Sequence, residues 1–178
     1  MQTTQWVGLP VDRQPRRSCQ GVQHGTQVDD SQLVCMWDGA TRRGSHSAGG
    51  MVLCGQGRSV LRAKGVQFAR IDEPMVVELL VLREAITWCL EWGLSEVRFE
   101  GDAKVIIDKI NQADSRDNHL GAVLEEICQH FDAHPGFSVR FVGRDNNRVA
   151  HSVARKALSL YPSGNRLFDF RAWLLSRM

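Results

Sequence analysis

The sequence predicts a single α/β domain in which a mixed sheet is covered by helices on both faces, and three observations predict it. The chain has 178 residues, close to one ordinary domain plus some tail. In its first half, three short apolar stretches are joined by glycine-containing turns, which is typical of an antiparallel meander. In its second half, segments whose apolar residues have the spacing of a helix are followed by segments whose apolar residues alternate as in a strand. Two later strands, each preceded by a helix, should therefore run parallel to the first.

The predicted domain spans residues 31–162, between two terminal segments. Residues 1–30 are rich in Gln, Gly, Thr and Arg and show neither a helix nor a strand period, so we expect a disordered or loosely attached leader. Residues 163–178 form a C-terminal tail with several apolar side chains. We expect a short helix in this tail that packs on the domain.

The meander begins with an apolar run at 33–37, which predicts a strand that ends at the turn Asp38-Gly39. A loop is expected at 41–47. The second and third strands are predicted at 49–54 and 60–68, with a glycine turn between them.

The alternating half starts with a helix from about Met75 to Trp92, which Gly93 should end. The periods that follow predict, in order, a strand at 96–100, a helix at 103–110, a helix from 118 or 119 to 130, and a strand at 137–141. Asp145 or Asn146 is expected to cap the last helix, which runs to about Leu160.

Composition limits the class of protein. With 43% apolar and 24% charged residues, the chain is typical of soluble globular proteins, and its net charge of +2 is weak evidence for a nucleic-acid partner. No apolar run approaches about 18 residues, so we expect no membrane span. The chain has five cysteines, an odd number, and no two of them form a CxxC pair, which disfavours a disulfide framework or a zinc ribbon. We expect free thiols in a reducing, intracellular compartment, with nucleus and cytoplasm both open.

Two acids follow predicted strands. Asp38 comes after the first strand and Asp102 after the strand at 96–100. If these strands are parallel neighbours, both carboxylates lie at the same edge of the sheet, where ligands of such sheets gather.

Glu78 is a third acid, and it lies on the apolar stripe of its predicted helix. Its neighbours three, four, seven and eleven residues on are all apolar: Val81, Leu82, Ala85 and Cys89. A lone ionised carboxylate in such a place is costly, so we expect Glu78 to be protonated, paired with a cation or bound to a metal.

Three hard oxygen ligands at one place suit Mg²⁺ or Mn²⁺. Two such ions would activate a water and stabilise the leaving oxygen of a phosphodiester. Spacing alone leaves another interpretation open, in which Asp38 only makes a turn, Asp102 only caps a helix and Glu78 pairs with an arginine.

From about Leu33 to Leu160 the chain resembles the plant ribonuclease H-like family, which is of type 1 and is often found in, or derived from, reverse transcriptases of non-LTR retroelements. The matching stretches, in chain order, are 37–40, 48–52, 77–85, 97–104 and 142–151. The resemblance implies a five-stranded mixed sheet, with three antiparallel strands and then two parallel ones. It also implies an endonuclease that uses Mg²⁺ or Mn²⁺ to hydrolyse the RNA strand of RNA–DNA hybrids, with Asp38, Glu78 and Asp102 as metal ligands.

The chain departs from the family pattern in three places. His151 stands where these enzymes usually have a fourth acid. Near a helix N-terminus a neutral imidazole is favoured, and it could ligate a metal or move a proton, so we include His151 among the catalytic candidates; an edge histidine with no special role is the alternative. The link at 142–147 is short and has no histidine, and Pro74 and Met75 replace polar residues that typically touch the hybrid.

Four arginines are candidates for nucleic-acid contact. Arg42 and Arg43 follow Asp38 closely, and Arg144 and Arg148 are expected on one face of the last helix, together with Arg155. Such residues bind phosphates without sequence specificity. Solvated surface charge is the alternative for each of them.

Three functions remain open from the sequence. The first is a hybrid-cleaving nuclease, which we expect to act as a monomer on an RNA–DNA hybrid or another duplex. The second is a catalytically weak or inactive ribonuclease H-like module that binds nucleic acid, which His151 and the missing histidine loop favour. The third is a retroelement remnant that binds other proteins, which retention of all three acids disfavours.

Overall fold

The computed structural model describes residues 32–42, 46–112, 120–160 and 167–177. The expected leader therefore lies outside the described residues. Within the described part, no helix combines the length and apolar character that crossing a membrane requires.

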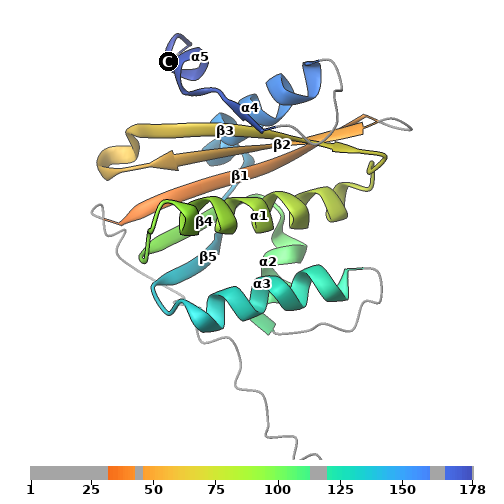
Figure 1. The fold of residues 1–178 in the computed structure, drawn as a ribbon, viewed down its shortest axis with the longest axis vertical. Helices are drawn as coiled ribbons and strands as arrows, with labels where there is room; N and C mark the ends of the chain where they lie inside the picture. Colours follow the sequence, from red (N-terminus) through yellow and green to blue (C-terminus); the bar gives the residue numbers. More distant parts are fainter. Residues whose placement is uncertain (1–31, 43–45, 113–119, 161–166, 178) are drawn as a thin grey trace, which may run out of the picture.

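A single mixed sheet forms the centre of the molecule, with strand order β5-β4-β1-β2-β3-β6 (Figure 1). Its strands are β1 (Leu33–Arg42), β2 (His46–Cys54), β3 (Val60–Ala69), β4 (Val97–Gly101), β5 (Phe137–Phe141) and β6 (Leu167–Asp169). The first three pair antiparallel, and β4 and β5 add on parallel to β1. The predicted five-stranded arrangement is confirmed. The sixth strand, which pairs antiparallel with β3, was not predicted.

Helices cover both faces of the sheet, as predicted (Figure 1). One face carries α1 (Pro74–Glu91), α2 (Lys104–Gln112) and α3 (Gly121–Ala133), and the other carries α4 (Arg148–Ser159) and α5 (Arg171–Leu175). Because side chains alternate along a strand, Cys35 and Trp37 of β1 enter the core under α1, whereas Val34 and Met36 enter the core under α4.

Two predicted boundaries were wrong. The strand expected to end at the turn Asp38-Gly39 runs on through both residues to Arg42, which pairs with His46 of β2, so the expected loop at 41–47 begins and ends in strand. The last helix is capped neither by Asp145 nor by Asn146. Residues Arg144–Asn147 form a short 3-10 helix, η2, and α4 begins at Arg148 with Asn147 at the cap position. The Asn147 side chain makes no capping bond and bonds elsewhere, because it serves the site described next.

Candidate metal centre

Asp38 lies in the middle of the sheet. It belongs to β1, which is flanked by β2 and β4, and its side chain points to the face that α4 covers because it is in phase with Val34 and Met36. Only 4% of the residue is exposed. An acid in this position is desolvated by the surrounding strands and has little access to water.

Asp102 directly follows β4, the strand next to β1, and lies level with Asp38. The two strands are parallel and Met36 of β1 pairs with Glu100 of β4, so the residues two positions further on each chain come side by side at the carboxyl end of the sheet. The parallel-neighbour arrangement expected from the sequence therefore holds.

Glu78 reaches the same place from α1, on the opposite face of the sheet from α4. It passes over Gly39, whose backbone N–H donates a hydrogen bond to the Glu78 carboxylate. A Cβ atom at position 39 would lie 3.2 Å from Glu78 Cδ and 3.1 Å from Val77 Cγ1. The glycine after Asp38 thus leaves room for the glutamate beside the strand.

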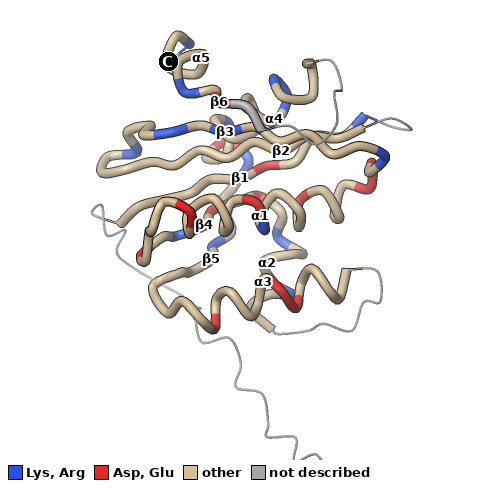
Figure 2. Tube along the Cα trace, in the orientation of Figure 1, with Lys and Arg blue, Asp and Glu red and all other residues tan. Residues whose placement is uncertain are grey.

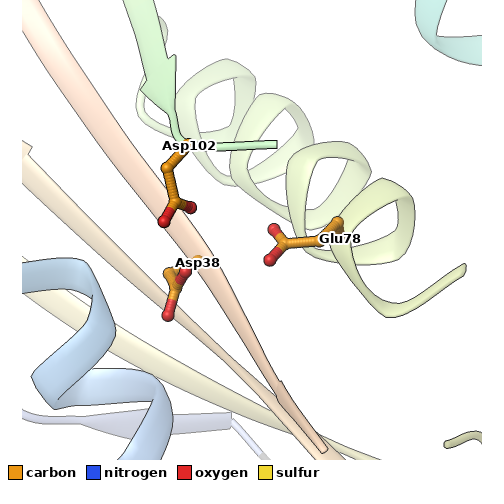
Figure 3. Close-up of side chains that lie close together, drawn as sticks. All are labelled: Asp38, Glu78 and Asp102. Atoms are coloured by element: carbon orange, nitrogen blue, oxygen red, sulfur yellow. The ribbon is translucent and has the colours of Figure 1, made fainter. Parts of the chain in front are cut away.

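The three carboxylates converge, with Glu78 pointing from its helix toward Asp38 and Asp102 (Figure 3). One oxygen from each of Asp38, Glu78 and Asp102 lies within 4.8 Å of the other two. The structure therefore brings together the three acids that the sequence singled out, at a separation that one cation or a close pair of cations can span.

Burial and mutual repulsion raise two pKa values at this centre. The pKa of Glu78 rises to about 8, chiefly because of burial and then because of the Asp38 charge, while the Gly39 N–H lowers it. The pKa of Asp38 rises to about 6, again chiefly by burial, with the hydrogen bond from His151 lowering it and Asp102 raising it. Both shifts have the sign expected for acids that lack a counter-charge.

No lysine or arginine in the described part of the chain forms an ion pair with any of the three acids. In addition, Glu78 Oε2 is buried without a hydrogen-bond partner among the described residues. The interpretation in which Glu78 pairs with an arginine finds no partner among the described residues. An oxygen-only donor set with an unpartnered buried atom fits a hard divalent cation.

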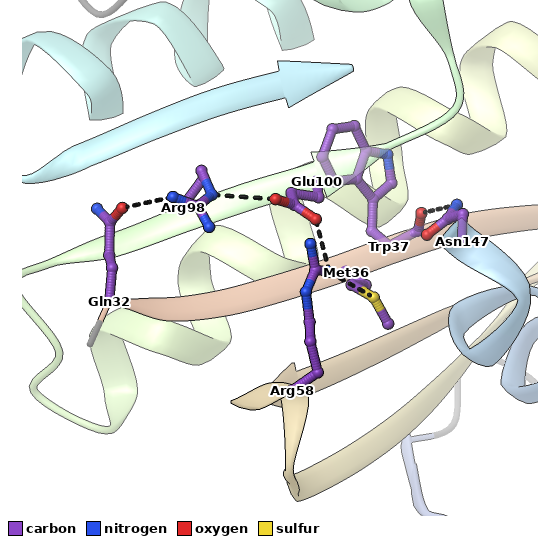
Figure 4. A network of polar contacts seen from close by, with 7 residues as sticks. All are labelled: Gln32, Met36, Trp37, Arg58, Arg98, Glu100 and Asn147. Atoms are coloured by element: carbon purple, nitrogen blue, oxygen red, sulfur yellow. Dashed lines mark hydrogen bonds and ion pairs between the residues drawn. The ribbon is translucent and has the colours of Figure 1, made fainter. Parts of the chain in front are cut away.

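Glu100 shows how this fold treats a buried acid that is structural. It lies on β4, two residues before Asp102, and is fully buried. Arg98 Nε approaches Glu100 Oε1 at 3.0 Å and Arg58 Nη1 approaches Oε2 at 2.8 Å, while Arg98 also donates to Gln32 (Figure 4). Two guanidinium groups neutralise this carboxylate, whereas no guanidinium group of a described residue pairs with Asp38, Glu78 or Asp102.

Asn147 supports the centre and was not singled out from the sequence. It is fully buried, and its Nδ2 donates to the Trp37 carbonyl oxygen at 2.9 Å and to Asp102 Oδ1 at 3.3 Å. It thereby ties the start of α4 to β1 and to the Asp102 carboxylate. The only signal in the sequence was its place at the predicted start of the last helix, where an asparagine is ordinarily a cap.

His151 lies beside the centre, on α4. Its Nδ1 is 2.8 Å from Asp38 Oδ2, and its side chain is 31% exposed. It touches one of the acids, but it does not belong to the group whose ligand atoms lie within 4.8 Å of one another.

The predicted arginines do not form one patch. Arg42 is exposed at the end of β1, and Arg43 lies outside the described residues. Arg144 belongs to η2 and not to the last helix, so the prediction that it shares a face of that helix with Arg148 was wrong. Arg148 is exposed and pairs with Asp145 at 2.6 Å. Across the described chain, Lys and Arg are spread over many elements (Figure 2).

Comparison with known proteins agrees with this architecture. The model of a family described as reverse transcriptase-like matches residues 36–157. No curated protein sequence matches.

Several solved structures share the fold. Ribonuclease H1 from the halophilic archaeon Halobacterium salinarum NRC-1 is 23% identical, with a TM-score of 0.60 over 71% of this chain and 96% of that one. LC11-RNase H1, isolated from compost by a metagenomic approach and solved in complex with an RNA/DNA hybrid, is 17% identical, with a TM-score of 0.63 over 72% of this chain and 100% of that one. A foamy viral protease-reverse transcriptase in complex with an RNA/DNA hybrid is 11% identical, with a TM-score of 0.65 over 85% of this chain and 23% of that one. At these identities the likeness establishes the ribonuclease H fold.

Proposed function

The chain belongs to the reverse transcriptase-like family, and from this we propose that it is a divalent-metal-dependent endonuclease of the ribonuclease H type that hydrolyses the RNA strand of RNA–DNA hybrids. The observation that carries the proposal is the convergence of Asp38, Glu78 and Asp102 within 4.8 Å, with no lysine or arginine of the described residues paired to them. Two structural neighbours that were solved with an RNA/DNA hybrid support the substrate class.

The chain's own residues would hold the metal ion and orient the carboxylates that bind it. Asp38, Glu78 and Asp102 would hold Mg²⁺ or Mn²⁺ through carboxylate oxygens. Gly39 fixes Glu78 through its N–H, and Asn147 fixes Asp102. A bound divalent ion would supply Lewis-acid polarisation of the phosphodiester and activation of the attacking water.

Contact with the nucleic-acid backbone would come from exposed arginines near this edge of the sheet. Arg42, Arg144 and Arg148 are exposed. Arg148 forms an ion pair with Asp145, which it would have to break in order to bind a phosphate. Such contacts are sensitive to salt and carry no sequence specificity.

The experiment is cleavage of an end-labelled RNA–DNA hybrid by the purified chain in Mg²⁺ and, separately, in Mn²⁺. We expect cleavage of the RNA strand only, with single-stranded RNA and duplex DNA left intact. Asp102→Asn should reduce the rate by at least about 100-fold, since an amide is a poor ligand for the ion that stabilises the transition state. Glu84→Gln, on the same helix as Glu78 but outside the cluster, should cleave at the wild-type rate.

One observation favours a second candidate function, a ribonuclease H-like module that binds nucleic acid with little or no turnover. His151 stands at the position of the fourth acid and supplies no carboxylate. If the wild type and Asp102→Asn bind the hybrid equally in a gel-shift assay and neither cleaves it, this second function replaces the first.

A further inference from the structure

His151 lies beside Asp38, at the position where the family resemblance implies a fourth acid. Glu78 approaches Asp38 from α1, whereas His151 approaches it from α4, on the opposite face of the sheet. Asp102 follows β4, and its Oδ1 accepts a hydrogen bond from Asn147 at the start of α4. The Nδ1 atom of His151 is 2.8 Å from Asp38 Oδ2. One oxygen of Asp38 is therefore already engaged on the side away from Glu78.

The direction of this hydrogen bond follows from charge. A carboxylate that ligates a cation is ionised and can only accept hydrogen bonds, so the proton between the two groups belongs to His151 Nδ1. An N–H that points at Oδ2 occupies one of the two lone-pair directions of that oxygen, along which a second ion would otherwise coordinate it at roughly 2.1 Å.

The α4 side of Asp38 also offers no fourth carboxylate among the described residues that could share a second ion. Mg²⁺ and Mn²⁺ prefer several hard oxygen ligands. Among the described residues, the group of possible ligands comprises Asp38, Glu78 and Asp102, and neither ring nitrogen of His151 belongs to it. The place of a fourth carboxylate is thus taken by a hydrogen-bond donor.

We propose that His151 is a positioning residue that excludes a second cation, so that this centre holds one divalent ion, bound by Asp38, Glu78 and Asp102. This inference rests on the proposed function. In it, His151 orients the Asp38 carboxylate toward the single ion and does not itself coordinate the metal.

The test measures how many divalent ions bind to each chain. Mn²⁺, which replaces Mg²⁺ and is paramagnetic, is titrated into the full chain while electron paramagnetic resonance measures the free ion. We expect one ion per wild-type chain, and one for His151→Asn, because the asparagine amide also donates toward Asp38. His151→Asp adds a carboxylate and removes the donor, so we expect two ions and a spin-coupled signal of two neighbouring Mn²⁺ ions.

Two further measurements fix the interpretation. Glu78→Gln should abolish the single tight site in every background, which identifies it as the acid cluster, and thermal unfolding by circular dichroism confirms that each variant is folded. Electron spin echo modulation should show no directly coordinated imidazole nitrogen in the wild type, where His151 is bonded to Asp38 and not to the ion.

The outcomes are distinguishable. Two acid-dependent ions on the wild type, a coordinated imidazole nitrogen, or a single ion on folded His151→Asp would each overturn the inference and leave the proposed nuclease intact. No acid-dependent Mn²⁺ on any folded variant would overturn the proposed function and, with it, the inference.

Discussion

The carboxylate of Glu78 costs the metal-free protein stability whenever it is ionised. Its pKa is raised to about 8 from an ordinary value near 4.5, so the folded state binds the proton more tightly than the unfolded state does. For a raised carboxyl pKa, stability falls as the pH rises through the window between these two values. Asp38, raised to about 6, adds the same trend at lower pH.

We therefore expect the free energy of unfolding in EDTA to fall by a few kcal/mol between pH 5 and pH 9, since each pKa unit is worth about 1.4 kcal/mol. Glu78→Gln cannot ionise, so at pH 9 it should be more stable than the wild type in EDTA. Added Mn²⁺ should stabilise the wild type but not this variant. Urea unfolding at each pH measures both effects.

The matched control is Glu84→Gln on the same helix, where the carboxylate is 30% exposed and lies 3.6 Å from Arg83. It should keep the wild-type pH dependence. A metal-free wild type whose stability is the same at pH 5 and pH 9 would contradict the assignment of an uncompensated acid at position 78.

At the residue scale, the sequence predicted the three acids because each has a local signal. Asp38 and Asp102 end apolar strands, and Glu78 interrupts an apolar helix stripe. The role of Asn147 had no such signal, since an asparagine at a helix start is ordinarily a cap and only the fold brings Trp37 and Asp102 within its reach. The contact of His151 with Asp38 joins residues 113 positions apart and was likewise not predictable from spacing.

At the element scale, α4 approaches β2 so closely at Gly50 that no side chain fits at that position. Gly50 of β2 pairs with Asp38 across the strands, and a Cβ atom on Gly50 would lie 2.4 Å from the Ala150 carbonyl oxygen and 2.4 Å from the Ala154 nitrogen. These are backbone atoms of α4, which can yield only if the whole helix moves. This close approach sets where His151, next to Ala150, meets Asp38.

Gly50→Ala should therefore destabilise the fold by about 1–3 kcal/mol, the usual cost of overpacking a well-filled core, and displace His151 from Asp38. Chemical denaturation measures the first effect, and the NMR shift of the His151 ring measures the second. Gly143→Ala is the control, because a Cβ atom there meets nothing within 4 Å and the backbone is extended, with φ −65° and ψ 154°. Equal stabilities of the two variants would show that α4 has room to move.

Elements with a clear period were predicted well, even the five-residue strand at 137–141, which is observed at Phe137–Phe141, whereas elements without a period were not. The central helix predicted at about 75–92 is observed at Pro74–Glu91, because eighteen residues carry a sustained apolar pattern. The strand β6 has three residues, too few for any period, and it forms only because β3 offers an open edge. The 3-10 helix at Arg144–Asn147 was predicted as a link that leads into the last helix, since its residues are common both in such links and at helix caps.

At the scale of the whole molecule, we expect the C-terminal tail to fold as one unit with the domain. β6 covers the edge of β3, and Phe170, only 6% exposed, joins the core under α4 together with Leu174. A Cβ atom on Gly65 would lie 2.3 Å from the Phe170 ring and 2.9 Å from the Ala157 side chain, so the ring fills a space that the strand leaves open. The backbone N–H of Phe170 also donates to Ala63 at 2.8 Å.

Phe170→Ala should accordingly lower the stability of the entire domain by about 3 kcal/mol, the usual cost of removing a buried aromatic ring. Loss of the tail would also expose the N–H and C=O groups of β3, and exposed strand edges pair with other chains. We expect one cooperative unfolding transition at lower temperature, together with association that grows with protein concentration in light scattering. Leu175→Ala, which truncates a side chain that is 45% exposed, should change neither property. A Phe170→Ala protein that unfolds like Leu175→Ala would show that the tail is an appendage and that the folding unit ends before β6.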